Sequence, residues 1–330
     1  MRIYTLLIFI FSWCGLFASP TEKAKANEGE GVFRFLINNG RDPSIHLSEF
    51  IELNKSKLGR NNTLIKDVSY ALPSVSIETT QNNNTTKKKE PLFGKKHAEY
   101  SVESNRLKGA TFFLVSGHGG PDCGAIGKAD GHEIHEDEYA YDIMLRLARC
   151  LMIEGATVHI IIQDKNDGIR DDKILKNSNT ETCRGKTIPL NQKKRLQQRC
   201  DEINALFYGA KDKYKRAVFI HLDSRSTNQQ MDVFFYHHVN STGGKNLANT
   251  MRQTLKEQYQ KYQPNRGFTG TVSSRDLYVL NNTAPVGLFV ELGNIRNSFD
   301  QRRFLLSTNR QALANWMCRG FIADYENSKK

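Results

Sequence analysis

The second half of the chain alternates between short apolar runs and longer stretches in which apolar residues recur at helical spacing. The runs have the length and the side-chain types of buried strands. They are residues 111–115, 157–162, 217–221, 232–237, 277–280 and 287–292. One of the helical stretches places Ala140, Ile143, Leu147 and Leu151 on one face. Because strands alternate with helices, we predict an α/β fold with a twisted, largely parallel sheet of about six strands flanked by helices.

Three reactive side chains stand where predicted strands end. The first strand stops at the turn Ser-Gly-His-Gly-Gly, whose glycines let the backbone bend sharply and leave His118 in a cleft. His221 ends the third strand, and Glu291 lies near the end of the sixth. Sites of parallel sheets gather beyond the carboxyl ends of strands, so we expect one shared cleft. Two alternatives stay open: an incidental histidine in a common glycine turn, and a structural Glu291 paired with a basic group such as Arg296.

A further group of candidate metal ligands precedes the helix that contains Ala140. Residues 131–138 read GHEIHEDE and offer several imidazoles and carboxylates. Each acidic residue also has a simpler role, because the helix dipole favours negative charge in the first turn. Two histidines and a carboxylate, with a second carboxylate to spare, are the inventory of a catalytic zinc site.

The order and local context of these residues resemble the zinc-dependent N-acetylmuramoyl-L-alanine amidases, over residues 111–325. In that family a GHGG turn supplies the first histidine ligand, a glutamate before a helix the second ligand, and a histidine after a strand the third. A glutamate in a VELG-type strand end acts in catalysis. The resemblance therefore implies that His118, Glu136 and His221 bind Zn²⁺ and that Glu291 is catalytic.

Glu136 is selected by the resemblance alone. The family places its ligand carboxylate four residues before the equivalent of Ala140, and in this chain that position is Glu136. The neighbouring His132, Glu133 and His135 remain the other candidates for this ligand.

The resemblance implies a hydrolase that cleaves the amide bond between N-acetylmuramic acid and the L-alanine of the stem peptide. Its partners would be peptidoglycan and an activator protein of the cell envelope. A zinc peptidase acting on another exported peptide would use the same metal chemistry. A catalytically inactive scaffold that binds the cell wall is the alternative from a different class of protein. The sequence does not decide the preferred stem peptide or glycan length.

The N-terminus has the pattern of a secretory signal peptide. A basic start leads into an apolar run over residues 3–17, and small residues follow before Pro20. We therefore expect residues 1–20 to be removed on export to the periplasm, the cell envelope or the extracellular space, leaving no stable membrane span. A retained anchor is the alternative, although the run is shorter than the ~20 residues of a spanning helix. A net charge of +12 then favours an anionic cell envelope over nucleic acid as partner.

Five cysteines follow the expected signal, and an odd number leaves the disulfide pairing open. Residues 28–75 resemble a LysM-type module in their glycine–acidic opening, the end of their second helix and their terminal Leu-Pro, although no convincing strand precedes Glu28. A structural cap without sugar binding is the alternative. Residues 76–105 include the polar run TTQNNNTTKKKE and are predicted as a flexible linker. Residues 106–326 then form the catalytic domain, in which the polar stretch 164–190 is expected to be a lid or groove wall.

Overall fold

The structure is a computed structural model that describes residues 22–28, 30–41, 43–74 and 87–330. The chain divides into two compact units, Met1–Asn82 and Asn83–Lys330. The expected signal peptide and residues 79–86 of the polar run lie outside the described residues. No helix among the residues that the structure describes is long and apolar enough to cross a bilayer.

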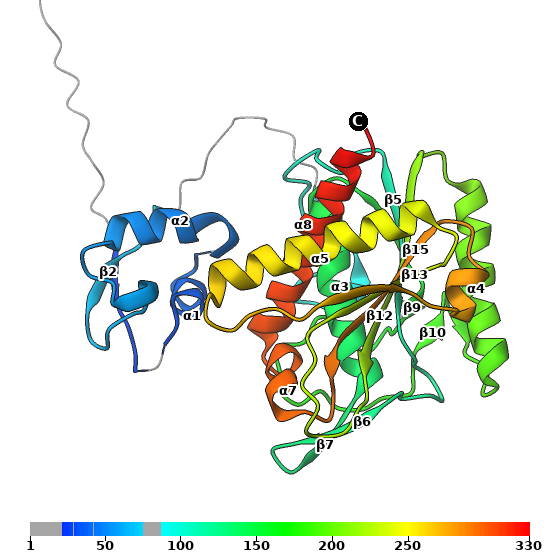
Figure 1. The fold of residues 1–330 in the computed structure, drawn as a ribbon, viewed down its shortest axis with the longest axis horizontal. Coiled ribbons are helices and arrows are strands. Elements are labelled where there is room, and N and C mark those ends of the chain that lie inside the picture. Colours follow the sequence, from blue (N-terminus) through cyan, green and yellow to red (C-terminus); the bar gives the residue numbers. More distant parts are fainter. Residues whose placement is uncertain (1–21, 29, 42, 75–86) are drawn as a thin grey trace, which may run out of the picture. The chain divides into compact units, whose positions relative to one another are not determined.

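A six-stranded sheet forms the centre of the second unit, with the strand order β14-β13-β15-β12-β5-β8 (Figure 1). Its strands are β5 (Ala110–Ser116), β8 (Thr157–Ile160), β12 (Tyr214–Asp223), β13 (Phe234–His237), β14 (Thr271–Ser274) and β15 (Val286–Asn294). All neighbours are parallel except β13 and β15, which are antiparallel. The predicted fold class, a largely parallel α/β sheet, is confirmed.

Helices cover both faces of this sheet, as Figure 1 shows. They are α3 (Glu136–Ile153), α4 (Gln192–Gly209), α5 (Thr242–Tyr262), α6 (Tyr278–Asn281), α7 (Ser298–Leu305) and α8 (Ser307–Asn327). Alternate residues of one strand enter different cores: Phe112 and Leu114 pack with α3, α5, α7 and α8, whereas Phe113 and Val115 pack with α4 and α6. This alternation leaves all of β5 buried, so the strand reads as a continuous apolar run.

The sequence prediction is wrong over 277–280, where the structure has the short helix α6 in place of a strand. Leu277, Val279 and Leu280 do pack in the core beside α4, but a short apolar run fits a buried helix as well as a strand. The sixth strand is instead β14, in which only Val272 is partly buried. An exposed edge strand of this kind carries almost no apolar pattern.

Two small antiparallel sheets form in the segments that connect the main strands of the second unit. β6 (Ile126–Ala129) pairs with β7 (His132–His135), and β9 (Ile162–Gln163), β10 (Thr182–Cys183) and β11 (Lys186–Thr187) form the other sheet. The stretch predicted as a lid or groove wall is therefore tied to the fold through β10 and β11, and Leu175 within it is fully buried.

The structure also differs from the predicted linker over residues 87–105. These residues form β3 (Lys88–Lys89), the 3₁₀ helix η2 (Pro91–Phe93) and β4 (Glu99–Tyr100) as parts of the second unit. Phe93 is completely buried in the core beside α3. Leu92 and Tyr100 also pack against this core, so a few apolar residues in a polar segment hold it to the second unit.

The first unit consists of β1 (Lys23–Lys25), α1 (Val32–Asn38), α2 (Pro43–Asn54), η1 (Arg60–Asn62) and β2 (Ser69–Ala71). No convincing strand is predicted before Glu28, yet β1 pairs antiparallel with β2. Backbone hydrogen bonds to β2 hold this mostly polar strand, so no apolar pattern is needed. Phe35, Phe50 and Tyr70 form the core of the unit, with ring centroids 5.6 to 5.9 Å apart.

Candidate active site

The glycine-rich turn after β5 places His118 at the carboxyl end of the sheet. His118, Gly119 and Gly120 all have positive φ angles, of 62°, 98° and 64°. Glycine adopts this backbone freely, whereas a histidine there is strained. Gly117 is required for a different reason, since a Cβ atom on it would lie 2.3 Å from the His221 ring. The turn therefore brings two imidazoles together that are far apart in sequence.

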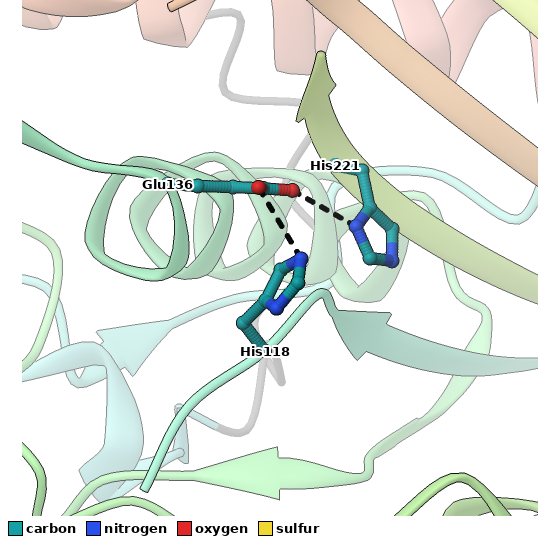
Figure 2. Close-up of side chains that lie close together, drawn as sticks. All are labelled: His118, Glu136 and His221. Atoms are coloured by element: carbon teal, nitrogen blue, oxygen red, sulfur yellow. Dashed lines mark hydrogen bonds and ion pairs between the residues drawn. The ribbon is translucent and has the colours of Figure 1, made fainter. Parts of the chain in front are cut away.

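Glu136 lies between these imidazoles (Figure 2). Its Oε2 is 3.2 Å from His118 Nε2, and its Oε1 is 2.9 Å from His221 Nδ1. The two rings are nearly perpendicular, with centroids 5.1 Å apart. One candidate ligand atom from each of the three residues lies within 4.8 Å of the others. The structure thus brings together the three predicted ligands, from the β5 turn, the first residue of α3 and the end of β12.

Each of the three side chains has a second contact that orients it. Backbone N–H groups of Ala125 and Leu222 donate to the two oxygens of Glu136, at 2.9 and 3.1 Å. The ring of His221 stacks on Phe289 with centroids 4.3 Å apart. These contacts leave little freedom for the ring or the carboxylate to turn away.

His118 is oriented by a contact that the sequence analysis missed. Asp122 Oδ2 lies 2.9 Å from His118 Nδ1, which directs the other ring nitrogen toward Glu136. Arg195, on α4, donates to the same Asp122 oxygen at 2.6 Å. The spacing of His118 and Asp122 in one tight turn is a sequence signal for the first contact, but nothing in the sequence points to Arg195.

Charge in the site is balanced through hydrogen bonds. Burial disfavours a charged Glu136, but hydrogen bonds with His118 and His221 hold its pKa well below the ordinary value. Burial also opposes a charged His118, yet hydrogen bonds with Asp122 and Glu136 raise its pKa to about 10. Burial lowers the pKa of His221. His118 is thus positively charged at neutral pH, and its charge stabilises the Glu136 carboxylate.

Glu291 lies on β15, where it pairs in register with His221 on β12. Its Oε2 is buried and has no hydrogen-bond partner among the described residues. Burial, with the nearby charges of Glu136 and Asp223, raises the pKa of Glu291 well above its ordinary value. The predicted partner Arg296 forms no ion pair with Glu291 among the described residues; its Nε donates to the Ile126 carbonyl at 3.3 Å. Glu291 is therefore an unpaired carboxyl group beside the three candidate ligands.

The other candidates for the carboxylate ligand lie on the β6–β7 hairpin. His132 and Glu133 are exposed, and His135 is partly buried. None of them belongs to the group of ligand atoms around His118 and His221 in the described chain. The hairpin ends at His135 and α3 begins at the next residue, Glu136. The change from the hairpin surface to the buried site thus occurs between two neighbouring residues.

A cavity of about 180 Å³ opens beside the two histidines. Its walls come from the ends of β5, β12 and β15 and from α4 and α6, and include Leu196, Leu277, Tyr278 and Phe289. Apart from the histidines and the arginines of α4, most of this lining is apolar. The site can therefore take an uncharged group of a substrate next to the candidate ligands.

Comparison with protein-family profiles identifies one family for this chain. The profile of the family Amidase_3, described as N-acetylmuramoyl-L-alanine amidase, matches residues 113–323. The comparison with curated proteins returns no match.

Several solved amidases are similar to the chain. The CwlD amidase from Clostridioides difficile, solved in complex with the GerS lipoprotein, has 21% identity and a TM-score of 0.49, covering 66% of this chain and 98% of its own. The amidase AmiC2 of Nostoc punctiforme has 20% identity and a TM-score of 0.46, covering 67% and 99%. Ami1 from Mycobacterium smegmatis has 18% identity and a TM-score of 0.48, with the same coverage. Because the family profile spans more than half of the chain, the protein belongs to the N-acetylmuramoyl-L-alanine amidase family Amidase_3.

Proposed function

We propose that this protein is a zinc-dependent amidase that cleaves the bond between N-acetylmuramic acid and the L-alanine of the stem peptide. One observation carries the proposal. Two imidazoles and a carboxylate, from His118, Glu136 and His221, converge beside the unpaired carboxyl group of Glu291 in a chain of the amidase family.

The residues fit a zinc ion by the chemistry of their donor atoms. Catalytic zinc takes three protein ligands of nitrogen and oxygen type and keeps one position open. His118, Glu136 and His221 would hold the ion, and partners such as Asp122 orient them as the outer contacts of zinc ligands usually do. When bound, zinc supplies the Lewis acid that polarises the scissile carbonyl and acidifies the attacking water.

Glu291 would move the proton in this reaction. It accepts a proton from the attacking water and passes it to the leaving amine, as a general acid and base. A raised pKa suits this role because the most effective group titrates near the working pH. The apolar cavity beside the histidines supports binding of the uncharged part of the substrate near the bond.

Export and attachment to the cell wall are further parts of the proposal. Residues 1–20 would direct export, and residues 28–75 would bind peptidoglycan as a LysM-like module. The pairing of β1 with β2 supports the second part, because it supplies the strand that the sequence pattern lacked. We also propose an activator protein of the cell envelope as a partner; among the compared amidases, CwlD was solved with the lipoprotein GerS.

Digestion of purified peptidoglycan, with the products identified by mass, tests the proposal. The expected products are stem peptides with a free L-alanine amino group and glycan strands with intact lactyl groups. Cleavage within the stem peptide would favour the zinc peptidase. No product from a zinc-loaded protein would favour the inactive scaffold that binds the wall.

A further inference from the structure

Three more buried carboxylates lie next to the proposed zinc ligands. Asp137 and Glu138 follow Glu136 in the first turn of α3, and Glu181 comes from the stretch before β10. Asp137, Glu138 and Glu181 are only 2%, 1% and 6% exposed. One oxygen of each lies within 4.8 Å of an oxygen of the other two. Carboxylates that repel one another are therefore packed together out of water.

One guanidinium group is the ion-pair partner of this cluster in the described chain. Arg170 Nη1 lies 2.8 Å from Glu138 Oε2. The same nitrogen also lies 3.0 Å from Asp167, so its charge is shared with a further acid. In these ion pairs the three carboxylates share a single guanidinium with Asp167. Buried charge is costly unless it is paired, so the cluster lacks positive charge.

The other contacts of the cluster come from neutral donors. The Gly120 N–H donates to Glu181 Oε2 at 2.8 Å, and the Ser178 hydroxyl donates to Glu181 Oε1 at 3.1 Å. The Glu138 N–H donates to Asp137 Oδ1 at 2.9 Å. These hydrogen bonds orient the carboxylates but do not neutralise them.

Asp137 also has an oxygen with no partner. Its Oδ2 is buried and makes no hydrogen bond within the parts of the chain that the structure describes. Buried oxygens are almost always paired, so an orphan among two other carboxylates indicates a missing positive group. The ligand that this observation points to is a cation or a proton.

We propose that Asp137, Glu138 and Glu181 form a second cation site, separate from the zinc ligands, that binds a hard divalent cation, Ca²⁺ or Mg²⁺. The donor atoms are oxygens only, which these two ions prefer over the nitrogen and oxygen set of the zinc site. Because Glu181 also binds the Gly120 N–H, the cation ties the 164–190 stretch to the turn that carries His118. The site goes beyond the proposed function. Its cation would hold in place the turn that carries the proposed zinc ligand His118.

The test uses the full mature protein, loaded with zinc and freed of other metals. It is titrated separately with CaCl₂ and MgCl₂, and bound zinc, calcium and magnesium are counted by elemental analysis while melting is recorded. One calcium or magnesium per chain is expected in addition to zinc, with a melting temperature raised by at least about 3 °C. Asp137→Asn and Glu181→Gln should lose both effects. Glu133→Gln, which changes an exposed carboxylate on β7, should keep them.

Failure of this site and failure of the zinc centre are distinguishable. His118→Ala should lose zinc but keep the second cation. Wild-type protein that binds neither calcium nor magnesium, and melts at the same temperature with or without them, would overturn the proposal even if the variants fail to fold. Asp137 would then carry a proton, and Asp137→Asn would be at least as stable as wild type. A response to Ca²⁺ or Mg²⁺ as large in Asp137→Asn and Glu181→Gln as in the wild-type protein would also overturn it, because the ion would bind elsewhere.

Discussion

Glu136 and Glu291 are buried glutamates at the same end of the sheet, and their carboxyl groups have opposite surroundings. Glu136 receives two backbone N–H groups and contacts two imidazoles, whereas one oxygen of Glu291 has no partner among the described residues. The pKa of Glu136 is held low, and that of Glu291 is raised. Burial is the largest influence on both groups, so the partners decide the difference. A carboxylate held ionised suits a metal ligand, and an unpaired carboxyl group suits proton transfer.

The largest effect is expected from removing the imidazoles that stabilise Glu136. His118→Ala or His221→Ala should lose the bound zinc and all measurable wall hydrolysis while the fold survives, because both ligands lie at the carboxyl ends of strands and not in the hydrophobic core. Zinc content, circular dichroism and digestion of peptidoglycan check this. Full zinc in both variants would show that the ion binds elsewhere.

Removing the proton-accepting group of Glu291 should separate turnover from metal binding. Glu291→Gln keeps the shape of the side chain but cannot accept a proton, so the rate should fall by ~10²–10⁴, the usual contribution of general acid–base catalysis. Zinc content should stay unchanged. The melting temperature should not fall, because the substitution removes no ion pair in the described chain. Near-normal hydrolysis would remove Glu291 from the mechanism, and a large loss of stability would indicate a structural role.

A smaller effect is expected from the contact that orients His118. Asp122→Asn keeps the size of the side chain but weakens its hold on His118 Nδ1 and on Arg195. Changes in such outer contacts usually reduce metal affinity by about 10–100-fold. Competition with a zinc-binding dye measures the affinity, and Asp130→Asn, an exposed residue, is the control. Equal affinity in both variants would contradict the orienting role.

Stability of the metal-free protein should depend on pH through His118. Burial opposes its charged form, but the hydrogen bonds with Asp122 and Glu136 raise its pKa from 6.5 to about 10. The stabilisation is therefore complete below pH 6.5 and is lost as the pH rises toward about 10. Protein stripped with a chelator should melt at a lower temperature near pH 10 than at pH 6.5. The melting temperature of His118→Ala should fall less over the same pH range. A fall as large as that of the wild-type protein would assign the pH dependence to other groups.

The smallest effect on the chemistry should come from deleting residues 21–82. Every residue named around Glu136 and Glu291 belongs to the second unit, and the deletion spares β3 and η2. Hydrolysis of soluble wall fragments should remain nearly intact, while sedimentation with insoluble peptidoglycan should weaken if the first unit is LysM-like. Unchanged co-sedimentation would assign that unit another role.

The sequence by itself determined the fold class and the residues that meet at the end of the sheet. Buried parallel strands leave continuous apolar runs, and their carboxyl ends must share one edge, so His118, His221 and Glu291 could be placed together before any coordinates. The apolar pattern did not predict the element type where the buried residues show no regular spacing along the chain. The short run 277–280 became α6, and the polar strand β1 is held by its pairing with β2.

Only the tertiary structure decided the surroundings of each site residue. The contact of Arg195 with Asp122 joins residues 73 positions apart, and that of Gly120 with Glu181 joins residues 61 positions apart. The same holds for charge: the sequence shows acidic residues at the start of a helix, but only the fold shows which of them are paired. Partners from distant segments set the pKa of a buried carboxyl group, and local sequence carries no record of them.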